Sequence, residues 1–164
     1  MQTYCIILAA GNSKRFSKKQ DKLFSSIHGV PLIFFTLTNI LKVFNKNEIF
    51  IVINKNLSKK HRSFLETLTE NKLIYGGRTR FKSLKNSIQH FKKDVNLLIH
   101  DAARPNIDKD LIKKVKNEIE NFNVYSVVPY TPITDTLKNK KLNKYHSVSR
   151  SQFINTQTPQ AIKL

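Results

Sequence analysis

The chain has 164 residues with 40% hydrophobic content, which is enough to bury one core, so we expect a single domain over residues 1–164. Its 29 lysine and arginine residues against 11 aspartate and glutamate residues give a formal net charge of +18. No apolar run is long enough to cross a membrane, none resembles a signal peptide, and the lone Cys5 can form no internal disulfide, which together favour a cytoplasmic protein without a membrane partner.

Short apolar runs alternate with amphipathic stretches along the chain, a pattern typical of strands and helices taking turns around a largely parallel sheet. Most of the runs are almost entirely apolar, as expected for strands that are covered on both faces. The fold class is therefore α/β. We predict strands at residues 3–9, 49–53, 73–75, 96–99 and 124–128.

Between these strands, apolar residues recur at helical spacing in several segments. The first predicted helix begins at Pro31, because proline is favourable in a first helical turn. The second covers about residues 59–69, and the third spans about residues 81–91. The fourth follows Asp108, a residue type that commonly caps a helix N-terminus.

The character of the sequence changes after Pro129. Residues 134–138 and 144–148 are short, polar and alternating, and they flank a turn rich in lysine and asparagine. This pattern predicts a protruding hairpin, a β-arm over about residues 131–152. An arm with so few apolar residues is unstable alone, so we expect it to rest on another surface, such as a second subunit.

A turn of small residues follows the first predicted strand, with the sequence AAGNSKRF at residues 9–16. In open α/β sheets, ligands bind outside the carboxyl ends of the strands. The small residues allow backbone N–H groups to approach phosphate oxygens. The cation of Arg15 stands just beyond them, and Lys22 lies a few residues further on. The turn is not a P-loop, because it has no Gly-Lys-Ser/Thr ending. It predicts a site for a triphosphate, although a plain structural turn with solvated cations is the alternative.

The pair Gly76-Gly77 follows the third predicted strand, and Arg80 and Ser83 stand at the start of the next helix. Two glycines let the backbone approach a flat ligand closely. A helix cap whose Ser83 side chain faces solvent is the alternative interpretation.

The sequence HDAARP follows the fourth predicted strand at residues 100–105. Asp101 is a candidate ligand for a divalent cation, and the two alanines leave room for a sugar ring. We interpret His100 as a strand-end residue rather than a catalytic base, because no acidic partner is evident nearby. Further polar groups that could surround a substrate phosphate are Asp135, Thr136, Arg150, Thr158 and Gln160.

In chain order these segments read AAG-x3-R, a following lysine, GG-x2-R-x2-S, HDAARP, DT-x-K and TPQ. The succession resembles the 2-C-methyl-D-erythritol 4-phosphate cytidylyltransferases over essentially the whole chain. AAG-x3-R is shared by many nucleotidyltransferases, whereas HDAARP joined to the other motifs is much more particular. The resemblance implies transfer of a cytidylyl group from CTP to 2-C-methyl-D-erythritol 4-phosphate, with release of pyrophosphate, in non-mevalonate isoprenoid precursor synthesis.

The resemblance also implies a Rossmann-like three-layer nucleotidyltransferase fold, with a mostly parallel mixed sheet and a β-arm through which two chains form a homodimer. It implies Mg²⁺ at Asp101, with Arg15 and Lys22 stabilising the charged transition state. The residues implied for CTP are Ala9, Ala10, Gly11, Arg15, Lys22, Gly77, Ser83, Asp101 and Ala102, and those implied for the acceptor are Arg104, Thr136, Arg150 and Thr158.

The chain departs from the family pattern in three places. Ser13 stands where the loop commonly has a second glycine, and Asp21 stands where a proline usually precedes the lysine. The third is at Leu164, because family members continue with further sheet and helix, including an acidic segment and a late lysine. We therefore expect a C-terminally truncated member.

Three other hypotheses remain open. Cytidylyltransferases that act on ribitol phosphate or another polyol phosphate share the CTP motifs and differ mainly in the acceptor pocket. A fragment that binds CTP without reacting is the second. The third is a basic nucleic-acid-binding module, which we disfavour because the lysines are scattered rather than gathered with stacking aromatic residues, so we expect no nucleic-acid partner.

Overall fold

The computed structural model describes residues 1–11, 21–71 and 73–164. Their centre is a six-stranded sheet with the strand order β5-β4-β1-β6-β12-β7. β1 pairs in parallel with both β4 and β6, β4 pairs in parallel with β5, and β12 runs antiparallel between β6 and β7. The expected mostly parallel mixed sheet is confirmed. The strands are β1 (Gln2–Ala9), β4 (Ile49–Ile53), β5 (Ile74–Tyr75), β6 (Val95–Asp101), β7 (Ser126–Val127) and β12 (Gln160–Lys163).

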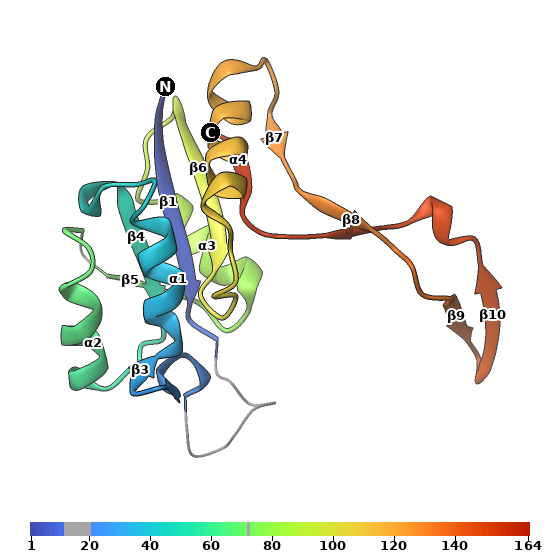
Figure 1. The fold of residues 1–164 in the computed structure, drawn as a ribbon, viewed down its shortest axis with the longest axis horizontal. Coiled ribbons are helices and arrows are strands. Elements are labelled where there is room, and N and C mark those ends of the chain that lie inside the picture. The colour runs from blue at the N-terminus through green and yellow to red at the C-terminus, as the bar shows by residue number, and fades with distance from the viewer. Residues whose placement is uncertain (12–20, 72) are drawn as a thin grey trace.

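Helices cover both faces of this sheet, which gives the three layers of the expected fold (Figure 1). Alternate β1 residues point to opposite faces, so that Ile7 packs with α1, α2 and α4 while Ile6 packs on the side of α3. Both side chains are fully buried. The helices are α1 (Leu32–Ile40), α2 (Lys59–Glu66), α3 (Arg80–Ile88) and α4 (Lys109–Asn121).

Several local expectations can be compared with these elements. The Asp108 cap is confirmed, because its side chain accepts a hydrogen bond from the Asp110 amide. The placement of Pro31 inside the first helix is wrong by one residue, because Pro31 has an extended backbone and precedes α1. It pairs instead with Ser26 in a small hairpin of β2 (Ser26–Ile27) and β3 (Val30–Pro31).

Cys5 is fully buried as a small apolar residue, and burial raises the pKa of its thiol.

A long arm leaves the sheet after β7 and returns to it at β12 (Figure 1). β8 (Tyr130–Pro132) and β11 (Ile154–Thr156) pair antiparallel along its neck. Its tip is the hairpin of β9 (Leu137–Lys141) and β10 (Lys144–Val148), joined by Leu142 and Asn143 at positive φ. Such a turn follows the right-handed twist of the two strands. No helix among the described residues has the length and apolar character needed to cross a bilayer.

Candidate functional site

A cavity of about 470 Å³ lies at the carboxyl ends of β1, β5 and β6, and we call it the carboxyl-end cleft. This is the edge of the sheet where an α/β fold places its ligands. Four separate segments of the chain contribute to its wall. The lining residues are Leu8, Ala10, Gly11, Lys22, Gly77, Arg78, Thr79, Arg80, Ser83, Asp101, Ala103 and Arg104.

Most residues expected to meet CTP line this cleft, but two alanines do not. Ala9 and Ala102 are buried in the core between the sheet and its helices. Ala102 is held there because its amide donates to the Leu8 carbonyl at 3.1 Å and its carbonyl accepts from the Thr36 hydroxyl at 2.8 Å. The neighbouring Ala103 lines the cleft in its place. Arg15, the other expected transition-state cation, lies outside the described residues.

Lys22 opens the short 3-10 helix η1 (Lys22–Phe24) beneath the cleft. The turn is fixed from within, because the side chain of Asp21 accepts a hydrogen bond from the Leu23 amide at 3.1 Å. Leu23 is buried and anchors the turn to the core. Asp21 thus replaces the usual proline with an N-cap that still defines the position of Lys22.

The glycine pair brings the end of β5 against the end of β1. A Cβ atom on Gly76 would lie 2.4 Å from the Ala10 Cβ and 2.8 Å from the Ser83 Oγ, so only glycine fits. The buried Ser83 hydroxyl accepts from the Gly77 amide at 3.1 Å and donates to the Thr79 carbonyl at 2.9 Å. The interpretation of Ser83 as a solvent-facing residue is therefore wrong, since the side chain fixes the shape of the glycine turn.

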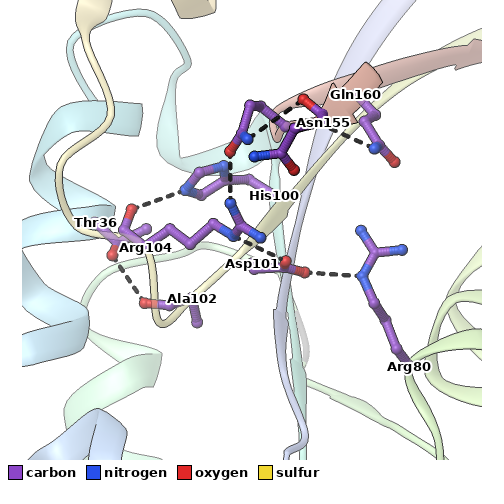
Figure 2. A network of polar contacts seen from close by, with 9 residues as sticks. Thr36, Arg80, His100, Asp101, Ala102, Arg104, Asn155 and Gln160 are labelled. Carbon is purple, nitrogen blue, oxygen red and sulfur yellow. Dashed lines mark hydrogen bonds and ion pairs between the residues drawn. The ribbon is translucent and has the colours of Figure 1, made fainter. Parts of the chain in front are cut away.

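Two guanidinium groups hold the carboxylate of Asp101 (Figure 2). The Arg80 Nε lies 3.0 Å from one oxygen, and the Arg104 Nε lies 3.3 Å from the other. Arg104 also donates to the Gln157 side-chain oxygen at 2.9 Å. Arg80 was not among the residues expected to bind CTP or the acceptor. Its place just after the glycine pair, at the start of the next helix, was the feature of the sequence that could have identified it. The Asp101 carboxylate therefore positions the side chains of both arginines.

His100 closes the turn that carries Asp101 and Arg104. His100 is 1% exposed, and its Nε2 lies 3.0 Å from the Arg104 carbonyl oxygen, to which it donates. Burial lowers the pKa of His100, against the opposing effects of that hydrogen bond and of the nearby Asp101 carboxylate. The expected strand-end placement of His100 is confirmed by its position within β6.

The lowered pKa of His100 makes stability depend on pH. Because the folded chain binds this proton less readily than the unfolded chain, the free energy of unfolding is fully retained above the ordinary value of 6.5 and falls as the pH drops below it. Urea denaturation at about pH 7.5 and about pH 5.5 should show a larger loss for the wild type than for His100→Gln, which cannot titrate there. Equal losses of unfolding free energy in the two proteins would contradict a lowered pKa of His100 in the folded chain.

A second cavity of about 330 Å³ lies beside the first, and Arg104 lines both. We call it the turn-side cavity. Of the residues expected to meet the acceptor, Arg104 and Thr158 are here, whereas Thr136 and Arg150 are exposed on the arm. Arg150 donates to the Thr134 carbonyl within the arm itself. The cavity is lined by His100, Arg104, Pro105, Asn106, Ile107, Leu111, Gln157 and Thr158.

The described residues contain no cluster of three or more histidine, cysteine, aspartate or glutamate side chains that could hold a metal ion by itself. Mg²⁺, however, is commonly held by one or two carboxylates together with substrate phosphates. The single carboxylate of Asp101, partly exposed in the cleft, fits that arrangement.

Comparisons with known proteins agree on one family. The family model described as 2-C-methyl-D-erythritol 4-phosphate cytidylyltransferase (IspD) matches residues 3–164. The bifunctional enzyme IspD/IspF of Pelagibacter ubique (strain HTCC1062) is 37% identical over 98% of this chain, which spans 43% of that relative. The 2-C-methyl-D-erythritol 4-phosphate cytidylyltransferase of Azobacteroides pseudotrichonymphae genomovar. CFP2 is 31% identical over 97% of this chain, which spans 72% of that relative.

A solved structure shares the fold. The bifunctional IspDF from Campylobacter jejuni superposes with a TM-score of 0.77 at 25% sequence identity. The match covers 99% of this chain and 41% of that chain. This chain therefore spans less than half the length of the bifunctional relatives.

Proposed function

The chain belongs to the 2-C-methyl-D-erythritol 4-phosphate cytidylyltransferase family, and from this premise we propose that its carboxyl-end cleft binds CTP. The proposed reaction transfers the cytidylyl group to 2-C-methyl-D-erythritol 4-phosphate and releases pyrophosphate. It would serve isoprenoid precursor synthesis.

The observation that carries the proposal is the charge of the carboxyl-end cleft. Among the described lining residues, four are cations, Lys22, Arg78, Arg80 and Arg104, and one is a carboxylate, Asp101. The carboxylate is paired with Arg80 and Arg104, and its one negative charge does not balance the positive charges around it. The described wall therefore carries an excess of positive charge. Such a wall attracts the polyanionic triphosphate.

The shape of the cleft fits the two ends of CTP. Ala10 and Gly11 line the cavity, and a Cβ built on Gly11 would meet no described atom within 4 Å, so phosphate oxygens can approach the backbone there. On the opposite wall, the turn at Gly77 is fixed by Ser83 and offers rigid backbone groups to a flat base. We assign cytosine recognition to this turn.

The phosphate of the acceptor is itself the nucleophile in the proposed reaction. One of its oxygens attacks the α-phosphorus of CTP, the bond from that phosphorus to the β-phosphate oxygen breaks, and pyrophosphate leaves. No activated serine or cysteine is needed, because positioning and electrostatic stabilisation supply most of the catalysis in such transfers. We assign stabilisation of the added negative charge to Lys22, which lines the cleft, and to Arg15.

Mg²⁺ belongs to the proposal as the cation that neutralises charge on the triphosphate. Asp101 is the residue that would hold it. Arg80 and Arg104 both contact Asp101 in this structure, and they would be free to bind phosphate oxygens if the carboxylate held a cation instead.

We also propose a homodimer in which the arm of one chain completes the acceptor site of the other. Thr136 and Arg150 are exposed on the arm and line neither cavity of their own chain. The neck of the arm exposes Tyr130, Phe153 and Ile154, apolar side chains that a second chain could cover.

Pyrophosphate release is the experiment that tests the proposed reaction. We expect release from CTP only when 2-C-methyl-D-erythritol 4-phosphate is present. Release with ATP or UTP but not with CTP would contradict the assignment of the nucleotide. Ribitol 5-phosphate in a parallel assay tests the acceptor, and a higher rate with ribitol 5-phosphate would move the assignment to that substrate. CTP binding by calorimetry without any release would identify a binding protein instead.

A further inference from the structure

Gln157 lies at the root of the arm, between β11 and β12, where the chain returns to the sheet. Its backbone amide donates to the Pro129 carbonyl at 2.8 Å, which ties the returning limb of the arm to the outgoing one. Its own carbonyl accepts a hydrogen bond from the Gln160 side chain at 3.0 Å. The backbone of Gln157 is therefore held on both sides, and its side chain extends from a fixed point.

The side chain of Gln157 joins the arm root to Arg104, in the turn that follows β6. Its Oε1 accepts a hydrogen bond from Arg104 Nη1 at 2.9 Å, and its Nε2 donates to the Asn155 carbonyl at 3.4 Å. The contact with Asn155 orients the amide so that the oxygen faces Arg104. An acceptor is what a guanidinium group requires, because it carries only donors.

Arg104 depends on such a contact because its guanidinium group ends a long side chain that is half exposed. Its backbone is fixed, since the amide donates to the Asp101 carbonyl at 3.1 Å and the carbonyl accepts from His100. At the far end, Asp101 holds Nε at 3.3 Å and Gln157 holds Nη1, so contacts to two different nitrogens fix the guanidinium plane. One exposed ion pair alone would order such a side chain poorly.

The two groups that hold the Arg104 guanidinium differ in charge. Figure 2 shows the Asp101 carboxylate between the guanidinium groups of Arg80 and Arg104. Asp101 is an anion, so it competes with a phosphate group for Arg104. Gln157 is neutral and orients the guanidinium without cancelling its positive charge. If Asp101 held a cation instead, the hydrogen bond from Gln157 would still keep Arg104 in place.

We propose that Gln157 is a positioning residue, which orients the Arg104 guanidinium from the root of the arm so that its other N–H groups meet a phosphate in a fixed direction. Gln157 touches neither the phosphate nor the reacting atoms and acts through Arg104. The inference rests on the proposed function, in which Arg104 binds phosphate. It also joins the arm to the carboxyl-end cleft, because a shift of the arm root would move this hydrogen bond.

Arginine side-chain spectra test the positioning without any substrate. In protein labelled with ¹⁵N-arginine, hydrogen bonds to the Nη groups slow the rotation of a guanidinium about its Nε–Cζ bond. We expect this rotation in Arg104 to be about 3- to 10-fold faster in Gln157→Leu, which removes the amide at similar size, than in the wild type. Gln157→Glu keeps an acceptor oxygen for Arg104 and should restore the slow rotation. Equal rates in all three proteins would overturn the inference.

A double-mutant cycle tests whether Gln157 acts through Arg104. Gln157→Leu alone should raise the KM for 2-C-methyl-D-erythritol 4-phosphate about 3- to 10-fold, with kcat changed less than about twofold. In a protein that already carries Arg104→Met, the same substitution should change this KM less than about twofold, because the group that it positions is gone. Gln89→Leu, the same change at the exposed C-cap of α3, is the control and should match the wild type.

The outcomes separate a failure of this inference from a failure of the proposed function. If the effects of Gln157→Leu and Arg104→Met on the acceptor KM simply multiply in the double variant, Gln157 has only a structural role and the inference fails. If the wild type releases no pyrophosphate from CTP with the acceptor, the proposed function fails. The rotation rates of Arg104 then still decide whether Gln157 positions it.

Discussion

Replacing Lys22 with methionine should lower kcat for pyrophosphate release from CTP by about 100- to 1,000-fold, the cost of removing one preorganised group that stabilises transition-state charge. Methionine keeps much of the length and apolar stem of lysine while removing the ammonium group. The turn that carries residue 22 should persist, because it is fixed by the Asp21 cap and the buried Leu23. The measurement is a steady-state assay that varies CTP and the acceptor separately.

The control for this experiment is Lys113→Met, at an exposed position on α4 outside the carboxyl-end cleft. It removes the same single positive charge from the chain, so any loss due to net charge alone would appear in both variants. We expect Lys113→Met to keep the wild-type kcat. Equal rates for the two variants would remove Lys22 from transition-state stabilisation.

The variant Gly76→Ala should damage both the fold and the site. Its Cβ would lie 2.4 Å from the Ala10 Cβ, 2.8 Å from the Ser83 Oγ and 3.2 Å from the Val52 Cγ1. Ala10 and Val52 belong to the packed core, so the glycine turn must move instead. We expect a loss of about 1–3 kcal/mol in the free energy of unfolding, as for other overpacked sites, and weaker CTP binding. Urea denaturation and calorimetry measure the two effects.

Gly11→Ala is the matched comparison, because a Cβ there meets no described atom within 4 Å. Its free energy of unfolding should stay within about 0.5 kcal/mol of the wild type. CTP affinity should nevertheless fall, since the methyl group would stand in the wall assigned to the phosphates. If Gly76→Ala bound CTP as tightly as the wild type, the glycine turn would have no part in the nucleotide site.

The central elements of the fold follow from local sequence pattern. The predicted strand at residues 49–53 is observed with those bounds, because an uninterrupted apolar run buried on both faces leaves little choice of structure. The strand at residues 160–163 was not predicted. Its sequence QAIK has no distinctive alternation, and it becomes a strand because it fits between β6 and β7, a non-local pairing.

The general location of the site was predictable, but the orientation of its side chains was not. Glycines and cations that follow predicted strands indicated the edge of the sheet where the carboxyl-end cleft lies. Which of two adjacent alanines faces the cleft depends on the contacts of Ala102 with Leu8 and Thr36, from distant segments. The contact of Arg104 with Gln157 likewise joins residues 53 positions apart.

Titration of the ¹⁵N-labelled protein with CTP tests most directly whether these segments form one nucleotide site. We predict that the backbone amides of Gly11, Gly77 and Ala103 shift together, with a single dissociation constant, because all three line the same cleft. The same titration with Lys22→Met should give a weaker constant for all three. Shifts confined to the arm, or separate constants for the three amides, would contradict a shared site for CTP.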